Sequence, residues 1–121
     1  MHSQFIAIGA LFGLLAVALG AFGAHALRSR LAAEQLAVFQ TGVQYQMYHA
    51  LALIGVGVWL KMQPGRGLLT SAGWLFVVGI VLFSGSLYIL TLSGQRKFGA
   101  ITPLGGLAMM VGWLLVLVSA L

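Results

Sequence analysis

Hydrogen-bonding side chains crowd one half of a stretch that is long enough to cross a membrane. The stretch covers residues 41–60 and reads TGVQYQMYHALALIGVGVWL. At about 100° per residue in a helix, five of these side chains fall within an arc of about 140°, with Gln46 beyond it. They are Thr41, Gln44, Tyr45, Tyr48 and His49. Because hydrocarbon penalises unpaired polar groups, we predict that this face looks into a helix bundle or a wet cavity.

The chemistry open to this set is narrow. Glu34 is the only acidic residue among 121, which argues against two-carboxylate hydrolysis and against carboxylate-ligated metal sites. The chain has no cysteine and therefore no thiolate nucleophile. A single deep histidine with no buried carboxylate does not assemble a nucleophile, a base and an acid. We therefore expect a protein that is not an enzyme and that has no metal or cofactor.

Two histidines keep one cofactor hypothesis open. His25 and His49 could together ligate a haem iron. If one helix ends near residue 27 and the next begins near residue 41, His49 lies about 12 Å deep while His25 lies near the surface. One haem could not easily take both side chains from the same copy, so a neutral His49 bonded to a Tyr or Gln neighbour is favoured. A haem-binding membrane protein stays as an alternative.

Composition indicates that lipid covers most of this protein. Apolar residues make up 61% of the chain, and only six basic and one acidic side chains are present. Four apolar runs would each extend about 30–35 Å as helices, which matches a hydrocarbon core of about 30 Å. The sequence thus predicts an all-α integral membrane four-helix bundle, a single domain over residues 1–121. The predicted helices cover about 5–27, 41–60, 71–92 and 102–121, and Ser29 could cap a short interfacial helix over 30–40.

Small residues recur at spacings of three and four in the first and last runs. Such stripes allow neighbouring helix backbones to approach closely in a membrane. The predicted packing residues are Gly9, Gly13, Ala16, Gly20 and Ala24 in the first run and Gly105, Ala108 and Gly112 in the last.

Polar groups in the other runs lie toward the same end. His25 ends the first run, Ser84 begins a polar face in the third, and Thr102 followed by Pro103 is a typical helix start. We therefore predict a one-sided polar pocket near the first and third connections. Its candidate residues are His25, Thr41, Gln44, Tyr45, Tyr48, His49, Ser84, Tyr88, Thr91 and Thr102. The alternative is that these groups only bond to one another across helices and specify the packing.

The basic residues predict an orientation. Arg28, Arg30, Arg96 and Lys97 lie in the first and third connections, against Lys61 and Arg66 in the second. Cytoplasmic loops carry an excess of Lys and Arg, so we expect the first and third connections inside and both termini outside. The charges are scattered over three loops, which indicates contact with lipid headgroups and not with nucleic acid.

Four segments of the chain form a distinctive set: GAFGAHAL at 20–27, FQTGVQYQMYHA at 39–50, FSGSLY at 83–88 and ITPLGG at 101–106. In this order they resemble the family of small bacterial inner-membrane proteins typified by YgdD and YwdK. The resemblance covers nearly the whole chain and extends to transmembrane protein 256 of animals. It implies a four-helix protein of the bacterial plasma membrane whose activity is unassigned. The matching segments also contain Gly23, Ser86 and Pro103.

Two functional hypotheses follow. The first is a non-enzymatic membrane module whose polar pocket, or whose Gly and Ala surface, binds a membrane lipid, a small ligand, a second copy or another membrane protein. The second is an oligomeric channel or transporter for small solutes. Proton transport is disfavoured because titratable side chains stop halfway along the spans.

Overall fold

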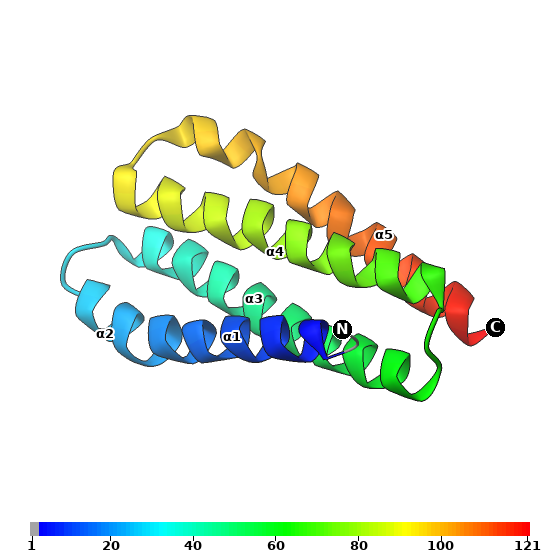
Figure 1. The fold of residues 1–121 in the computed structure, drawn as a ribbon. Coiled ribbons are helices and arrows are strands. Elements are labelled where there is room, and N and C mark those ends of the chain that lie inside the picture. Colours follow the sequence, from blue (N-terminus) through cyan, green and yellow to red (C-terminus); the bar gives the residue numbers. More distant parts are fainter. Residues whose placement is uncertain (1–2) are drawn as a thin grey trace.

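The computed structural model describes residues 3–121, and every regular element in that range is helical. The long helices are antiparallel, as Figure 1 shows, which confirms the all-α four-helix prediction. The elements are α1 (Gln4–Ala18), the π-helical η1 (Leu19–Gly23), α2 (Ala24–Leu27), α3 (Ala33–Met62), α4 (Gly67–Ser93), the 3-10 helix η2 (Arg96–Ala100) and α5 (Thr102–Ala120). α1, η1 and α2 form one continuous helix with a widened turn.

The helices pack in the order in which they occur along the chain. α3 and α4 are the central pair, α1 packs along α3, and α5 packs along α4 (Figure 1). α1 begins and α5 ends toward the α3–α4 turn, while the α2–α3 and α4–η2 connections lie at the other end (Figure 1). We call the end that contains the α3–α4 turn, residues 63–66, the turn end, and the end that contains residues 28–32 and 94–95 the loop end.

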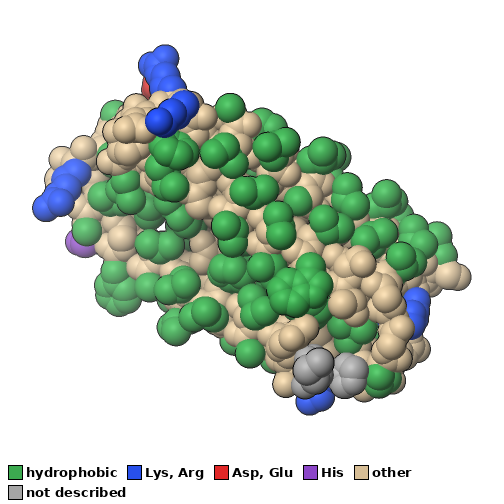
Figure 2. All heavy atoms as spheres, turned by 45° about the horizontal axis from the view of Figure 1, so that its top comes forward, with side chains coloured by type: hydrophobic (Ala, Val, Ile, Leu, Met, Phe, Trp, Pro, Cys, Tyr) green, Lys and Arg blue, Asp and Glu red, His purple; other side chains and the backbone are tan. Residues whose placement is uncertain are grey.

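Three of the four long helical segments have the length and composition of membrane spans. Residues 4–27, 67–93 and 96–120 are each long and apolar enough to cross a bilayer. α3 is the most polar helix, yet it has 30 residues and connects the loop end to the turn end, so it must cross the same thickness. Figure 2 shows the apolar surface between basic groups at the two ends.

The start of α3 differs from the predicted boundary. Residues 33–40 are the first turns of α3, continuous with the second span, and not a separate interfacial helix. This segment contains good helix formers and no breaker, and the Thr41 hydroxyl donates to the Ala37 carbonyl at 3.0 Å across the expected boundary. Ala32, and not Ser29, occupies the N-cap position of α3.

Two glycines mark the closest helix approaches. A Cβ atom on Gly9 of α1 would lie 2.7 Å from the carbonyl oxygen of Ala50 on α3. A Cβ on Gly105 of α5 would collide with the backbone nitrogen of Phe83 on α4. Of the other small residues singled out in the sequence, Ala16, Ala24 and Gly112 are buried, while Gly13, Gly20 and Ala108 are partly buried.

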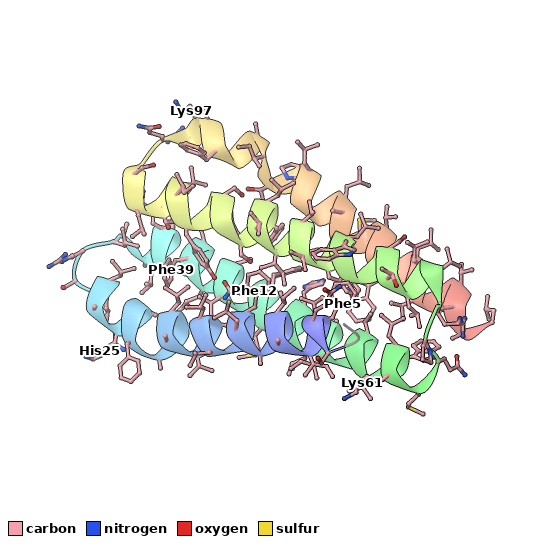
Figure 3. The ribbon with its side chains drawn as sticks, in the orientation of Figure 1. Phe5, Phe12, His25, Phe39, Lys61 and Lys97 are labelled. Atoms are coloured by element: carbon pink, nitrogen blue, oxygen red, sulfur yellow. The ribbon has the colours of Figure 1, made fainter. Side chains whose placement is uncertain are left out.

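The apolar core is concentrated toward the turn end. Phe5 near the start of α1 lies within the bundle, as Figure 3 shows, and its ring packs edge-on against Trp74 with centroids 5.1 Å apart. The large side chains that fill the space between the helices are Phe5, Leu53, Val56, Leu60, Leu69, Phe76, Ile80 and Met109. Most of the buried polar side chains of the spans, among them Gln46, Ser84 and Thr91, lie between this core and the loop end, and Ser119 is buried at the turn end.

Candidate functional site

A buried amide lies at the centre of the polar groups. Gln46 on α3 is only 4% exposed. Its Nε2 donates to the Phe12 carbonyl oxygen of α1 at 2.8 Å, and its Oε1 accepts from the Tyr88 hydroxyl of α4 at 2.6 Å. One side chain thus connects three helices and uses both its donor and its acceptor.

Hydroxyl groups add further cross-links toward the loop end. The Ser84 hydroxyl of α4 donates to the Gly42 carbonyl of α3 at 2.6 Å. The hydroxyls of Ser86 on α4 and Thr102 on α5 lie 2.6 Å apart and share a hydrogen bond. Thr102 therefore bonds across helices, whereas the sequence predicted that it would cap its own helix. Thr91 is buried and donates to the Leu87 carbonyl within α4 at 2.9 Å.

The hydrogen bonds of His49 define its tautomer. The Trp113 indole N–H of α5 donates to His49 Nε2 at 3.0 Å, so this nitrogen carries no proton. Nδ1 lies 2.7 Å from the Tyr45 carbonyl oxygen and is the protonated donor. The imidazole is neutral, as the sequence favoured, although its partners are a tryptophan and a backbone carbonyl. Both ring nitrogens are engaged in hydrogen bonds, so ligation of an iron by His49 would have to replace one of them.

The hydroxyls of Thr41 and Thr91 bond only within their own helices, and four further candidate residues lie apart from the interhelical network. His25 is exposed at the end of α2, where Figure 3 shows it at the loop end, and Gln44, Tyr45 and Tyr48 are exposed on α3. Tyr48 has 55% of its surface accessible. The Tyr45 ring packs on Phe83, with ring centroids 4.7 Å apart.

The burial pattern of α3 explains this division. Its buried face follows alternating spacings of three and four residues, the repeat that keeps one face of a helix against its neighbours. The positions are Phe39, Gly42, Gln46, His49, Leu53, Val56 and Leu60. The stripe passes through Gln46 and His49 but not through Gln44, Tyr45 or Tyr48. Sequence reasoning placed Gln46 beyond the polar face, and this spacing is the signal that identifies it.

Every buried polar side-chain atom in residues 3–121 has a hydrogen-bond partner. The network therefore fixes the helices relative to one another, and each buried polar side-chain atom in the described part of the chain already has a partner within the protein. Nor do residues 3–121 gather three His, Cys, Asp or Glu side chains that could hold a metal ion.

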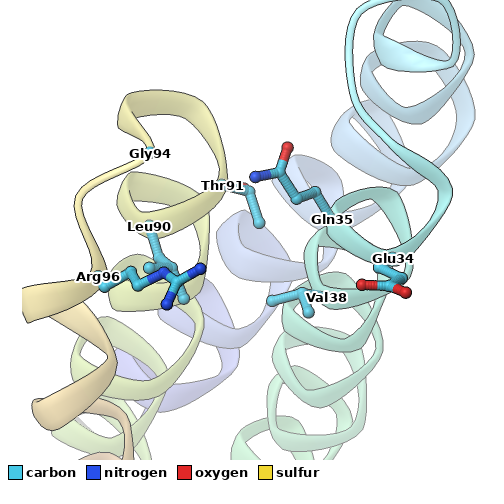
Figure 4. Close-up of a pocket in the computed structure, with 7 residues that line it drawn as sticks. All are labelled: Glu34, Gln35, Val38, Leu90, Thr91, Gly94 and Arg96. Carbon is cyan, nitrogen blue, oxygen red and sulfur yellow. The ribbon is translucent and has the colours of Figure 1, made fainter.

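A cleft at the loop end offers unpaired polar groups instead. It lies between the first turns of α3 and the last turns of α4, with a volume of about 300 Å³ (Figure 4). Its floor contains Val38, Leu90 and the buried Thr91, and its rim is exposed and polar. The lining residues are Glu34, Gln35, Val38, Leu90, Thr91, Gly94 and Arg96. Of the candidate pocket residues, only Thr91 lines this cleft.

Two further hollows open along the sides of the bundle and are apolar. One, of about 330 Å³, lies between α1 and α4 and reaches Gln46. The other, of about 250 Å³, lies between α3 and α5 beside Trp59 and Trp113. Both arise because each outer helix packs on one central helix and leaves a furrow toward the other. Such furrows in a membrane are accessible to acyl chains.

Comparisons with known proteins identify relatives over the whole length of the chain. The family model described as "Protein of unknown function (DUF423)" matches residues 19–106. The chain is 53% identical to the UPF0382 membrane protein YwdK of Bacillus subtilis, over 96% of this chain and 94% of the relative. It is 43% identical to the UPF0382 inner membrane protein YgdD of Escherichia coli K12, over 100% of this chain and 92% of the relative. No solved structure matches the chain. Its helices, its apolar surface and these relatives together show that the chain belongs to the DUF423 family, also named UPF0382, of small membrane proteins of unknown function.

Proposed function

We propose that this protein is a non-enzymatic membrane module that binds one phospholipid molecule in the cleft at the loop end. The observation that carries the proposal is the cleft itself, which has a charged rim above an apolar floor. An amphiphile has the same division into a polar and an apolar part. A volume of about 300 Å³ lies at the lower limit for ligand pockets, so it suits a headgroup and its glycerol better than a whole lipid.

The position of the cleft supports a ligand that comes from the bilayer. Glu34 lies in the first turn of α3 and Gly94 directly follows α4, so the rim is at the level where the chain leaves the membrane. Val38 and Leu90 lie about one turn deeper, at the height where the acyl chains of a lipid begin. A headgroup on the rim would therefore keep its ordinary depth in the bilayer.

The other functions receive less support from these contacts. Large apolar side chains, among them Leu53, Phe76 and Ile80, fill the space between the helices, so a conducting path would have to run between copies. Haem ligation would require His49 to give up its bond to Trp113 or its bond to the Tyr45 carbonyl. Catalysis would require a buried acid or base beyond the neutral His49, and the network supplies hydroxyls and one amide.

Filling the cleft tests the proposal. We expect Val38→Trp to place an indole over the floor and to abolish the retention of one phospholipid per protein in native mass spectrometry from mild detergent. Val58→Trp is the matched control, because Val58 is on the same helix, 45% exposed and away from the cleft. Equal phospholipid retention by both variants and the unchanged chain would contradict the proposal.

We also propose that the loop end faces the cytoplasm of a bacterial cell, with the termini outside. The imbalance of four basic side chains against two supports this orientation. Because the chain has no cysteine, single-cysteine variants report sidedness without background. A membrane-impermeant maleimide applied to intact spheroplasts should label Gln63→Cys at once and Gln95→Cys only after permeabilisation. The reverse pattern would invert the orientation and leave the cleft unchanged.

A further inference from the structure

The rim of the cleft carries both signs of charge on opposite walls. Glu34 is on α3, and Arg96 begins η2 beyond α4. Figure 4 shows both side chains beside the opening, with the apolar Val38 between them in this view. Within residues 3–121 neither side chain makes a hydrogen bond or an ion pair, and Figure 4 draws no contact between them. The carboxylate and the guanidinium are therefore each available to a ligand.

We infer that the cleft selects a phospholipid whose headgroup is a zwitterion with a primary ammonium, an ethanolamine phospholipid. This inference rests on the proposed function and names its lipid class. The Arg96 guanidinium presents paired N–H donors that match two phosphate oxygens. The Glu34 carboxylate is an acceptor with a full negative charge, and an ammonium is its complementary donor. A zwitterionic headgroup thus carries one partner for each wall.

The remaining lining residues separate this headgroup from choline. A quaternary ammonium has no N–H group and is typically held against aromatic rings. The seven residues that line the cleft within the described chain include no aromatic side chain. They do include Gln35, whose side-chain carbonyl is a second acceptor for an ammonium. The donors of ethanolamine therefore find partners here that choline would leave unused.

The same contacts disfavour anionic headgroups. A glycerol headgroup would place no positive charge near Glu34, and the carboxylate of a serine headgroup would lie beside it. Placing like charges together, or leaving a charged group without its partner on binding, lowers affinity and is a common source of specificity. The single acidic residue of the chain therefore acts as the selectivity determinant.

Native mass spectrometry with synthetic lipids of identical acyl chains tests the inference. We expect the unchanged protein to retain the ethanolamine lipid about tenfold more than the choline or glycerol lipid, since one charged hydrogen bond discriminates at this level. Glu34→Gln should reduce the ethanolamine lipid to the level of the choline lipid. Arg96→Gln should lower the retention of all three lipids. Lys97→Gln is the matched control, a neighbouring cation outside the cleft lining, and should change nothing.

The outcomes separate the two proposals. Equal retention of the ethanolamine and choline lipids, both lowered by Val38→Trp, would overturn the headgroup class and leave phospholipid binding standing. Retention of every lipid unaffected by Val38→Trp would overturn phospholipid binding in the cleft itself. Displacement of the lipid by an equal concentration of soluble glycerophosphoethanolamine would assign the cleft to a free metabolite. Glu34 and Arg96 are exposed, so their substitution leaves the packed interior untouched.

Discussion

Arg66 at the turn end and Arg96 at the loop end show two uses of the same side chain. Arg66 donates to Gln63 Oε1 at 2.6 Å and to the Ser119 carbonyl at 2.6 Å, and its guanidinium lies 5.7 Å from the centre of the Trp59 ring. Arg96 lies beside an open cleft and forms no such bond within the described chain. One arginine joins the last turn of α5 to the α3–α4 turn, whereas the other is available to a ligand.

The packing around the two arginines also differs, because the turn end is filled and the loop end is open. Phe5, Leu60 and Leu69 fill the turn end with apolar side chains that are at most 4% exposed. At the loop end, polar cross-links replace part of that core, and the helices separate into the cleft. We propose that the turn end mainly supplies stability and that the loop end supplies the binding surface, a division that substitutions at the two ends can test.

The largest effect is expected where helix backbones touch, because both ends depend on that packing. Gly105→Ala would place a methyl group against the backbone of Phe83, and overpacking of this kind costs about 1–3 kcal/mol. Gly106→Ala is the control, since a Cβ there would lie 3.8 Å from the Phe83 ring, an ordinary contact. Denaturation by SDS should show a lower midpoint for the first variant alone, and equal midpoints would mean that α5 can shift without cost.

Removing the Arg66 side chain should destabilise the turn end without changing phospholipid retention. Arg66→Ala loses two charge-assisted hydrogen bonds and leaves the Ser119 carbonyl without its side-chain donor, a loss of about 1–2 kcal/mol for partly buried groups. The thermal midpoint in detergent should fall while the retained phospholipid stays at the level of the unchanged protein. A loss of lipid in parallel with stability would show that the two ends are coupled.

The polar network between the ends should contribute less than either packing or the Arg66 contacts. Gln46→Leu keeps the volume but removes bonds to α1 and α4, and interhelical hydrogen bonds in membranes average about 0.6 kcal/mol, so about 1 kcal/mol is expected. Gln44→Leu, an exposed glutamine on the same helix, should leave the midpoint unchanged. If the two variants have the same unfolding midpoint, the bonds of Gln46 contribute nothing to helix association.

Sequence patterns predicted the helices well because length and hydropathy are local properties. The all-α bundle, the spans and the small residues near Gly9 and Gly105 follow from composition and from spacings of three and four. The beginning of α3 was harder, since nothing in the sequence forces a break at residue 40, and the helix continues through Thr41. Whether a helix continues past a membrane surface depends on the neighbours that it meets there.

The site was less predictable because hydrogen-bond partners come from other helices. A helical wheel grouped Tyr45 and Tyr48 with His49, but packing against α1 and α4 selects the stripe through Gln46. The sequence predicts a pocket near the first and third connections, where the cleft lies, but of the lining residues it names only Thr91. Glu34 and Arg96 are 62 positions apart, and only the antiparallel arrangement of α3 and α4 brings them to one opening.

The smallest effect on stability is expected for Arg96, and this is the sharpest test of the contrast between the two arginines. The Arg96 side chain is exposed and makes no hydrogen bond to residues 3–121, so Arg96→Gln should change the free energy of unfolding by less than about 0.5 kcal/mol. Phospholipid retention should nevertheless fall, the opposite of the result for Arg66→Ala. If Arg96→Gln lowers the thermal midpoint in lipid-free detergent, the arginine supports the fold directly. If it does so only with lipid present, the lost stability equals the lost binding energy, as linkage requires, and the charge acts through the ligand.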